Sequence, residues 1–387
     1  MSKTCPEPSQ RGGVGFRRLP GDRTLIALLL GLLVVGLGGC HRVEVGKLEE
    51  KPISTADKFF DVAHANGDTF VIVGYRGEVL RSTDAGKTWQ EVPRPTELSL
   101  TDVEFVGEYG WAAGQGGMIV HSRDCGQTWN TQPSNTDVTL MAISFAPDKL
   151  HGWASGDLST VVSTENGGET WSAQRIEVSQ VGLTEDIALA IPDLIYYDVH
   201  FLNEKEGWMV GEYGNIRHTT DGGKTWDSQH QSLLDQMTRA SRDVMALPAL
   251  FRIRFWDSQK GLAIGASGDI IGTQDGGQYW YFIAKEGDRG ALSLQQPRLV
   301  ENVPPVHLYN LFLDPSPNGP VVVVGASGVA MQSSSGGATW EISKLPLEIY
   351  TWINGADFNE NGKGVVVGGK GLILRTEDWG KTWLLPE

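Results

Sequence analysis

The segment STDAGKTW, from Ser82 to Trp89, gathers side chains that could form the working part of an enzyme. Hydroxyl, carboxylate and amine groups of this kind carry out proton transfer and nucleophilic attack. Seven segments of the chain, however, follow the same pattern, hydroxyl-x-Asp-x-Gly-x-Thr-Trp, with small departures. A catalytic group is needed once per active site, whereas a segment repeated along one chain is normally part of a structural module. The repetition therefore predicts a structural turn in a repeat fold.

The residue types of this segment, which we call the Asp-box, are sufficient to explain a turn. A carboxylate accepts hydrogen bonds from backbone N–H groups, hydroxyls do so more weakly, glycine permits a tight backbone and tryptophan covers an apolar face. Asparagine replaces the acid in the third copy and serine in the sixth, which a turn tolerates better than an active site would. The seven acid positions are Asp84, Asp124, Asn166, Asp221, Asp275, Ser335 and Asp378.

Each Asp-box belongs to a longer unit with a constant order of signals. Two short strands joined by a glycine turn precede it, as in VGYRGEVLR from Val73 to Arg81. A strand with an apolar-x-Phe core lies before these, and a brief outer strand begins at the tryptophan. Forty-nine glycines and thirteen tryptophans fit many short strands and tight turns. The sequence predicts an all-β fold, a seven-bladed β-propeller of four-stranded antiparallel blades over residues 58–387.

The N-terminal 39 residues have the pattern of a bacterial lipoprotein leader. Arg17, Arg18 and Arg23 precede an uncharged apolar run, residues 25–39, which has the length of a signal-peptide core and is short for a membrane span. The run ends in Leu-Gly-Gly-Cys, which resembles a lipobox, so we expect cleavage after residue 39 and lipidation of Cys40. The alternative is an uncleaved membrane anchor. Both interpretations place the body of the protein outside the cytoplasm, at a membrane surface.

Two questions about the ends of the propeller stay open. The outer strand of the seventh unit, TWLLPE, is short. Residues 43–48 could pair beside it and close the ring, or residues 40–57 could serve only as a tether.

Charge and cysteine content exclude several classes of function. Removal of the leader takes away five basic and two acidic residues, which changes the formal net charge from −15 to −18. Nucleic acids and anionic lipid surfaces would repel such a protein. With Cys5 in the leader and Cys40 lipidated, Cys125 has no disulfide partner, and no Cys/His group has metal-ligand spacing. We expect no metal, no cofactor and no catalytic residue.

The spacing of the box tryptophans shows where the repeats differ. The intervals are 40, 42, 55, 54, 60 and 43 residues, so three consecutive units are enlarged. The additions run approximately over residues 177–194, 228–247 and 284–305, and all three are expected on the face opposite the Asp-boxes.

Two of these insertions have helical spacing. The second holds an apolar stripe, with Arg239 and Arg242 elsewhere on the same cylinder; the stripe is Leu233, Met237, Ala240 and Val244. Residues 184–190 of the first insertion form a shorter candidate. Such a helix either packs on its own domain or binds a partner.

The inner strands carry charged residues at equivalent positions. The residue before the apolar core position is Asp61, Asp102, Asp198, Arg252 or Asn310 in five units, and Glu104, His200 and Arg254 stand two residues further on. Equivalent positions form a ring around the propeller axis. Buried charges cost free energy unless they are paired, so salt bridges between blades are favoured. Arg252 and Arg254 are also candidates for partner binding, being basic groups beside the largest insertions.

A lipoprotein leader followed by seven units of the form VGxxGxIxxSxDGGxTW resembles the photosystem II assembly and stability factors of the Ycf48/Hcf136 type. The clearest instance is GWMVGEYGNIRHTTDGGKTW, from Gly207 to Trp226. The resemblance implies a non-catalytic lumenal or periplasmic propeller, a monomer, that binds an integral membrane protein or its assembly intermediate. In a photosynthetic organism this partner would be a photosystem II subunit. The family presents an arginine-rich patch, to which Arg76, Arg217, Arg252 and Arg254 could contribute here, together with the inserted Arg239 and Arg242.

Two alternatives remain. Asp-boxes also occur in sialidases, which need an arginine cluster, a tyrosine nucleophile and an acid pair. The segment FRIR, residues 251–254, partly matches the Phe/Tyr-Arg-Ile-Pro motif of that family, but it lacks the proline and falls in the fifth unit. The other alternative is a general interaction module or structural protein of the cell envelope.

Overall fold

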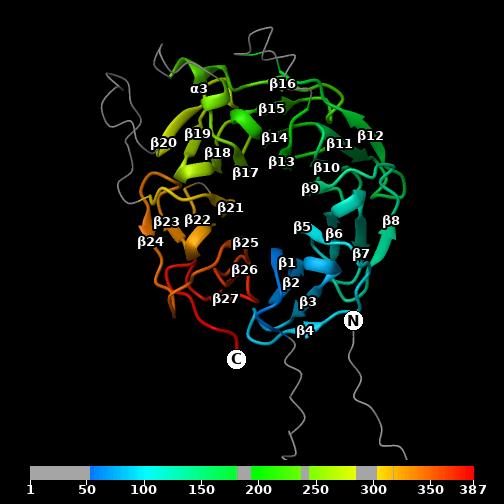
Figure 1. Cartoon of the computed structure of the whole chain (residues 1–387), viewed down its shortest axis with the longest axis vertical. Helices are drawn as coiled ribbons and strands as arrows, with labels where there is room; N and C mark the ends of the chain where they lie inside the picture. The colour runs from blue at the N-terminus through cyan, green and yellow to red at the C-terminus, as the bar shows by residue number, and fades with distance from the viewer. Residues whose placement is uncertain (1–52, 180, 182–192, 237–243, 285–302, 317) are drawn as a thin grey trace, which may run out of the picture. The chain divides into compact units, whose positions relative to one another are not determined.

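The repeat units fold as separate antiparallel sheets that follow one another around a common axis (Figure 1). The computed structural model describes residues 53–179, 181, 193–236, 244–284, 303–316 and 318–387. Six sheets have four strands and the seventh has three, and in each the strands are ordered as in the sequence. The prediction of a seven-bladed β-propeller is confirmed.

The strand bounds are regular from blade to blade. Blade 1 consists of β1 (Phe59–Asn66), β2 (Thr69–Gly74), β3 (Val79–Ser82) and β4 (Gln90–Glu91); blade 2 of β5 (Leu100–Val106), β6 (Tyr109–Gly114), β7 (Ile119–Ser122) and β8 (Asn130–Gln132); blade 3 of β9 (Leu140–Phe145), β10 (Gly152–Gly156), β11 (Thr160–Thr164) and β12 (Ser172–Arg175). Blade 4 consists of β13 (Tyr196–Phe201), β14 (Gly207–Gly211), β15 (Ile216–Thr219) and β16 (Asp227–Ser228); blade 5 of β17 (Leu250–Phe255), β18 (Gly261–Gly265), β19 (Ile270–Thr273) and β20 (Tyr281–Ala284). Blade 6 consists of β21 (Leu308–Leu313), β22 (Val321–Gly325), β23 (Ala330–Ser333) and β24 (Glu341–Ile342); blade 7 of β25 (Ile353–Phe358), β26 (Gly364–Gly368) and β27 (Ile373–Thr376).

Aromatic stacking joins several neighbouring blades. The ring of Trp153 on β10 lies 3.4 Å, centroid to centroid, from that of Phe201 on β13, and Trp226 of the next Asp-box meets the same phenylalanine edge-on at 5.9 Å. The same sandwich recurs around Phe145 and around Phe255. Because each such phenylalanine packs between the second strand of one blade and the box tryptophan of its own, these contacts bury apolar surface between blades as well as within them.

Each Asp-box forms a turn between the third and fourth strands, held by its own side chains. In the first box, Thr88 donates to Asp84 from its backbone N–H (2.9 Å) and its hydroxyl (2.6 Å), and Ser82 donates to the same carboxylate (2.7 Å). Asn166 and Ser335 accept the matching backbone N–H in their boxes, each at 2.9 Å. The hydroxyl, acid and threonine positions of the pattern thus bind one another within the turn.

Every inner strand has a β-bulge at its second residue. In each blade the pairing with the second strand skips one residue, and these seven residues are Phe60, Thr101, Met141, Tyr197, Phe251, Tyr309 and Asn354. A bulge twists the strand and changes the direction of the side chain it carries. The seven bulges lie at the same end of the inner strands.

The ring closes through side chains and loops of blades 1 and 7. The backbone N–H of His64 donates to the carboxylate of Asp357 (2.7 Å), and Phe59 and Val62 pack against Val365. At the outer edge, Arg375 and Leu384 pair through two backbone hydrogen bonds, of 2.9 and 2.7 Å, which stand in for a fourth strand. Residues 43–48 lie outside the described residues, so their part in closure stays a prediction.

The connections contain little helix in the described part of the chain. Short 3-10 turns link the second and third strands of five blades, and the helix α3 (Gln231–Asp235) begins the second insertion, with Leu233 and Leu234 buried. Arg239 and Arg242, the rest of the predicted stripe up to Ala240, and residues 184–190 lie outside the described residues. No described helix is long and apolar enough to cross a membrane.

Candidate functional site

The charged residues of the inner strands meet in one cluster at the axis. The guanidinium of Arg252 lies 3.1 Å from Asp61, 2.8 Å from Asp102 and 3.2 Å from Asp198, so it bridges four blades with the acids of blades 1, 2 and 4. Arg254 binds Asp198 from the other side at 2.6 Å. All three aspartates and Arg252 are buried. The predicted salt bridges between blades are therefore present.

The cluster contains more acidic than basic side chains. Raised carboxyl pKa values reduce the excess negative charge, because a carboxyl with a raised pKa keeps its proton to higher pH. Burial raises the pKa of Asp61 well above its usual value. Although burial also acts on Asp102, the charge of Arg252 and a hydrogen bond from Asp61 hold its pKa below the usual value. Of these two carboxyls, Asp61 is therefore the one that binds a proton more readily. Burial raises the pKa of Glu104 to about 8 and lowers that of His200 to about 3, so His200 is neutral near pH 7.

The same acids also tie the innermost strands to one another. Asp102 accepts from the backbone N–H of Ile143 in the next blade (2.8 Å), and Asp198 accepts from Ile253 (2.8 Å). Glu104 accepts from Phe145 at 2.6 Å. An inner strand is the edge of its sheet, and its N–H groups need acceptors. The acids supply these acceptors from the preceding blade.

A small cavity of about 230 Å³ remains among these side chains. Its charged groups, including Arg252, Arg254 and Asp198, already bind one another. A ligand here would have to break buried ion pairs, which costs free energy. The arrangement suits a structural role at the centre of the ring. No group of acids, histidines and cysteines among the described residues could hold a metal ion.

The other predicted arginines lie apart from this cluster. Arg217 is buried in blade 4, where it donates to the hydroxyl of Tyr196 (3.2 Å), to Ser228 (2.9 Å) and to the carbonyl of Glu177 (2.5 Å). Arg76 is exposed in the turn between β2 and β3. Arg239, Arg242 and Cys40 lie outside the described residues. The described arginines thus do not form one exposed patch, and a binding role for each stays a prediction.

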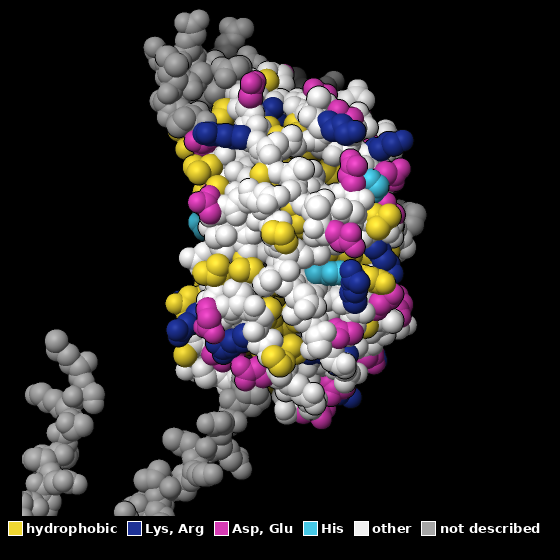
Figure 2. Space-filling model, turned by 90° about the vertical axis from the view of Figure 1, so that its right-hand side faces the viewer, with side chains coloured by type: hydrophobic (Ala, Val, Ile, Leu, Met, Phe, Trp, Pro, Cys, Tyr) yellow, Lys and Arg dark blue, Asp and Glu magenta, His cyan; other side chains and the backbone are white. Residues whose placement is uncertain are grey.

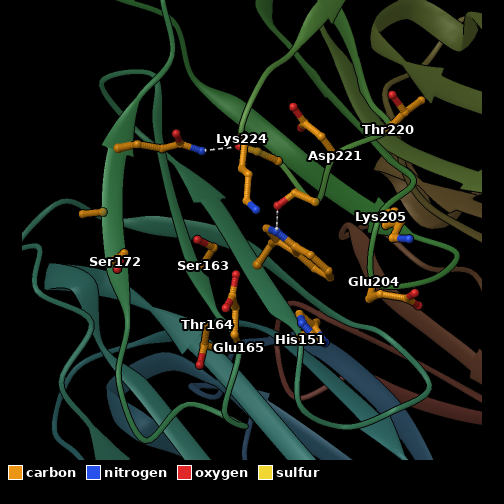
Figure 3. Close-up of a pocket in the computed structure, with 15 residues that line it drawn as sticks. His151, Ser163, Thr164, Glu165, Ser172, Glu204, Lys205, Thr220, Asp221 and Lys224 are labelled. Carbon is orange, nitrogen blue, oxygen red and sulfur yellow. Dashed lines mark hydrogen bonds between the residues drawn. The ribbon is translucent and has the colours of Figure 1, made fainter.

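A second groove, of about 510 Å³, opens between blades 3 and 4 on the face that carries the Asp-boxes, which we call the box face. Figure 3 shows Lys224 from one box and Glu165 from the preceding box beside it, with His151, Glu204 and Lys205 along the rim. The indole N–H of Trp153 donates to the carbonyl of Gly222 at its base (2.9 Å).

The contacts under this groove recur between other blades. Gln174 donates to Gly223 across the blade 3–4 boundary (2.6 Å), and Gln132 and Gln229 bind the boxes of the next blades in the same way at 3.1 and 2.9 Å. The hydrogen bonds under the groove are therefore part of the repeat.

The opposite face holds the 3-10 turns and the connections from each outer strand to the next inner strand; we call it the turn face. The described ends of the insertions lie against those turns. Ser159 donates its backbone N–H to the carbonyl of Leu194 (2.7 Å), and Gly214 donates to Pro248 just after the second insertion (2.8 Å). The described ends thus lie on the face predicted for the insertions.

The outer wall of the ring offers less to a specific partner. Figure 2 looks onto one side of the ring and shows acidic and basic side chains mixed, with apolar ones scattered between them. A mixed surface of this kind is typical of solvent-exposed protein.

The comparisons with known proteins agree with the repeat pattern. The family model for the photosynthesis system II assembly factor YCF48 matches residues 42–135 and 183–245. No curated protein matches the sequence.

Three solved structures illustrate the shared fold. A structure of YCF48 bound to D1 peptide is 19% identical, with 85% of this chain and 97% of that chain covered and a TM-score of 0.56. The GH74 enzyme of Niastella koreensis is 15% identical with a TM-score of 0.59, and 86% of this chain covers about half, 54%, of that enzyme. The WD40 propeller domain of Doa1 is 15% identical over 84% of this chain and 95% of that domain, with a TM-score of 0.56. At these identities the structural matches show the fold alone. The sequence match and the propeller fold together confirm the resemblance of this chain to the photosystem II assembly factor YCF48 family.

Proposed function

We propose that this protein is a non-catalytic, membrane-anchored binding protein that holds a membrane-protein subunit during assembly. In a photosynthetic organism the subunit is one of photosystem II. The observation that carries the proposal is the YCF48 family match, to which the structure of YCF48 with a D1 peptide adds a propeller that binds a segment of another protein.

The chemistry of the propeller centre supports a binding role over catalysis. A sialidase needs free arginines to hold the carboxylate of its substrate. Here Arg252 and Arg254, the arginines of the FRIR segment, are both engaged by Asp198, and Arg252 also by Asp61 and Asp102. The positive charges of both arginines are therefore neutralised by aspartates of the propeller itself.

Anchoring is part of the same proposal. A lipid on Cys40 would hold the propeller at the membrane outside the cytoplasm, on the periplasmic face or in a thylakoid lumen, where loops of a nascent membrane protein are within reach. The acidic propeller is repelled by anionic lipids, so the lipid rather than the protein surface would supply the membrane attachment.

The test is affinity capture of the lipidated protein from membranes, with its companions identified by mass spectrometry. We expect recovery of an integral membrane subunit, and recovery to fall with Cys40→Ser, which removes the lipid site but leaves the propeller intact. Capture that yields no membrane subunit contradicts the proposal. So does release of sugar from sialosides by the purified protein.

A further inference from the structure

Exposed apolar side chains gather on the turn face. Large hydrophobic side chains there are from 36% to 80% exposed, and they are Tyr75, Leu98, Leu158, Met245, Leu347 and Tyr350. Tyr75 and Leu158 stand in turns between second and third strands, and the others stand in connections between blades. Among the other described residues, Leu150 and Tyr279 on the box face are comparable, and so are Ile342, Leu384 and Leu385 at the outer edges of blades 6 and 7. The side chains on the turn face make it the more apolar of the two faces.

The bulges add an apolar rim at the turn-face end of the axis. In five blades the bulged residue is aromatic or methionine. Together with Trp352, which directly precedes β25, these half-buried side chains form what we call the collar: Phe60, Met141, Tyr197, Phe251, Tyr309 and Trp352.

The rings of the collar contact their neighbours across blade boundaries. Phe251 lies 5.2 Å from Tyr197 and 5.8 Å from Tyr309, and Phe60 stacks on Trp352 at 5.9 Å, all between ring centroids. A bulge at a rim typically directs a side chain toward a ligand. Half-buried rings that already touch gain further burial if an apolar side chain is inserted at the mouth of the axis.

An acidic pocket of about 540 Å³ adjoins the collar on blades 3 and 4. Asp137, Asp157 and Glu212 line it together with the exposed Leu158. None of these three acids forms an ion pair with a lysine or arginine among the described residues, whereas Asp193 at the edge is paired with Arg175. Burial and the charge of Glu212 raise the pKa of Asp157.

The pocket and the collar are close enough to act together. Thr139 and Ile195 line the pocket, and each stands two residues before a collar residue, Met141 on β9 and Tyr197 on β13.

The turn at the pocket is also strained. Leu158 and Ser159 have φ of 53° and 54°, and six other blades have glycine at the position of Ser159. Non-glycine residues are held in this conformation at a cost, and such strain clusters at binding sites.

We propose that the collar and the acidic pocket bind an extended segment of a partner protein in which an apolar or aromatic side chain stands next to lysine or arginine. The inference rests on the proposed function, because it assigns that function a binding surface and a partner chemistry. The apolar side chain covers the collar, and the cation neutralises the carboxylates of Asp157 and Glu212. Glu212 already accepts a hydrogen bond from the backbone N–H of Ile195 (3.0 Å), but neither acid has a lysine or arginine partner among the described residues. Complementary charges of this kind fix the register of a bound peptide and exclude acidic competitors.

The experiment selects displayed random twelve-residue peptides on the detergent-solubilised full-length protein. We expect the enriched peptides to combine an aromatic or large apolar residue with lysine or arginine. Replacing that basic residue by glutamate in a synthetic copy should weaken binding at least about ten-fold, as loss of a central contact in an interface does. The Asp157→Asn, Glu212→Gln double variant and Tyr309→Ser should weaken it to a similar extent.

Two further variants separate binding from folding. Leu158→Asn removes an exposed apolar side chain and suits the positive φ, so binding should fall while the unfolding midpoint stays level or rises. Tyr279→Ser, on the box face, should leave binding unchanged.

Other outcomes overturn the inference. These are no enrichment, enrichment of peptides that lack a basic residue, or binding that the collar and pocket variants leave intact. The proposed function fails separately, when capture from membranes recovers no subunit. Recovery of a subunit by the Tyr309→Ser protein at the wild-type level would preserve the function and exclude this surface.

Discussion

At the scale of single residues, the centre of the propeller shows how a buried charge becomes part of the fold. Arg252 is one cation shared by three buried aspartates, and these aspartates also accept backbone N–H groups of neighbouring strands. Removing the cation would leave the buried carboxylates of Asp61 and Asp102 without an ion-pair partner, and Asp198 with Arg254 alone.

Arg252→Met should therefore lower the free energy of unfolding by about 3–5 kcal/mol, the usual cost of breaking a buried ion pair. Urea denaturation followed by tryptophan fluorescence measures the change. Arg76→Met is the matched control, because Arg76 is exposed and surface substitutions usually alter stability by less than about 0.5 kcal/mol. Equal stability of the two variants would show that the central cluster contributes little.

The raised pKa of Glu104 predicts the direction in which the free energy of unfolding changes with pH. Burial raises its pKa from 4.5 to about 8 in the folded protein. The unfolded carboxyl loses its proton near pH 4.5 while the folded one keeps it, so this group's contribution is complete below pH 4.5 and is lost as the pH rises to about 8.

Glu104→Gln keeps an acceptor for Phe145 but cannot ionise. Relative to wild type, the variant should gain stability progressively between about pH 4.5 and pH 8. Urea midpoints collected across this range test the trend, with the exposed Glu360→Gln as control. A difference that is constant with pH would contradict the raised pKa.

At the scale of the element, the Asp-box is a turn whose strength depends on one acceptor. Asp221 accepts from the backbone N–H of Thr225 (2.9 Å), from its hydroxyl (2.7 Å) and from the hydroxyl of Thr219 (2.9 Å). Ser335 keeps the corresponding bonds to Thr339 with a single oxygen, at 2.9 Å each. Boxes with aspartate and the box with serine at this position can therefore be compared within one protein.

Asp221→Ala should cost about 1–3 kcal/mol, because three hydrogen bonds to a charged acceptor are lost, and Asp221→Ser should cost less. Ser335→Asp in the sixth box should raise stability, since Thr339 already points its two donors at this position. Thermal unfolding of the three variants measures both directions. If Ser335→Asp destabilises the protein, the boxes are not equivalent and each is tuned to its blade.

At the scale of the whole molecule, described residues of blades 1 and 7 contact one another across the boundary where the ring closes. Blades 1 and 7 share a core that includes Phe59 and Val365, and the ion pair of Lys363 with Asp68 (2.8 Å) lies over it. The backbone N–H of Glu387 donates to the carbonyl of Lys87 in the first Asp-box (2.8 Å). All residues that make these contacts between blades 1 and 7 therefore follow residue 52 in the sequence.

A chain beginning at residue 53 should then unfold in one transition, with a midpoint close to that of a chain beginning at residue 41. Calorimetry of the two proteins checks this. A marked loss of stability in the shorter chain would show that residues 43–48 act as a closing strand, which is the other interpretation of the sequence.

Repetition made the fold predictable at the level of strands and turns. Seven Asp-boxes with one order of strand signals determine blade number and strand order, because each copy reports the same local geometry independently. The ring of Asp61, Asp102, Asp198 and Arg252 followed from equivalent positions on the inner strands. Blade number, strand order and the positions of the central charges all follow from the local periodicity of the sequence.

Long-range pairing was harder to predict. From the sequence, Arg217 is a candidate for an arginine-rich patch. In the structure it is buried, because the hydroxyl of Tyr196 and the start of the first insertion contact its guanidinium. The bulges at Phe60 and Tyr197 give no sequence signal beyond an extra aromatic residue beside the acid, since a bulge depends on the register with the neighbouring strand.

The sequence by itself determined the repeat, the structural role of STDAGKTW and the face that bears the insertions, because turns and strand order are local properties of the chain. Only the tertiary structure decided that the central arginines are neutralised by acids from other blades, and that a collar of rings adjoins carboxylates on the turn face. Those juxtapositions join residues from blades far apart in the sequence, and they exist only once the ring has closed.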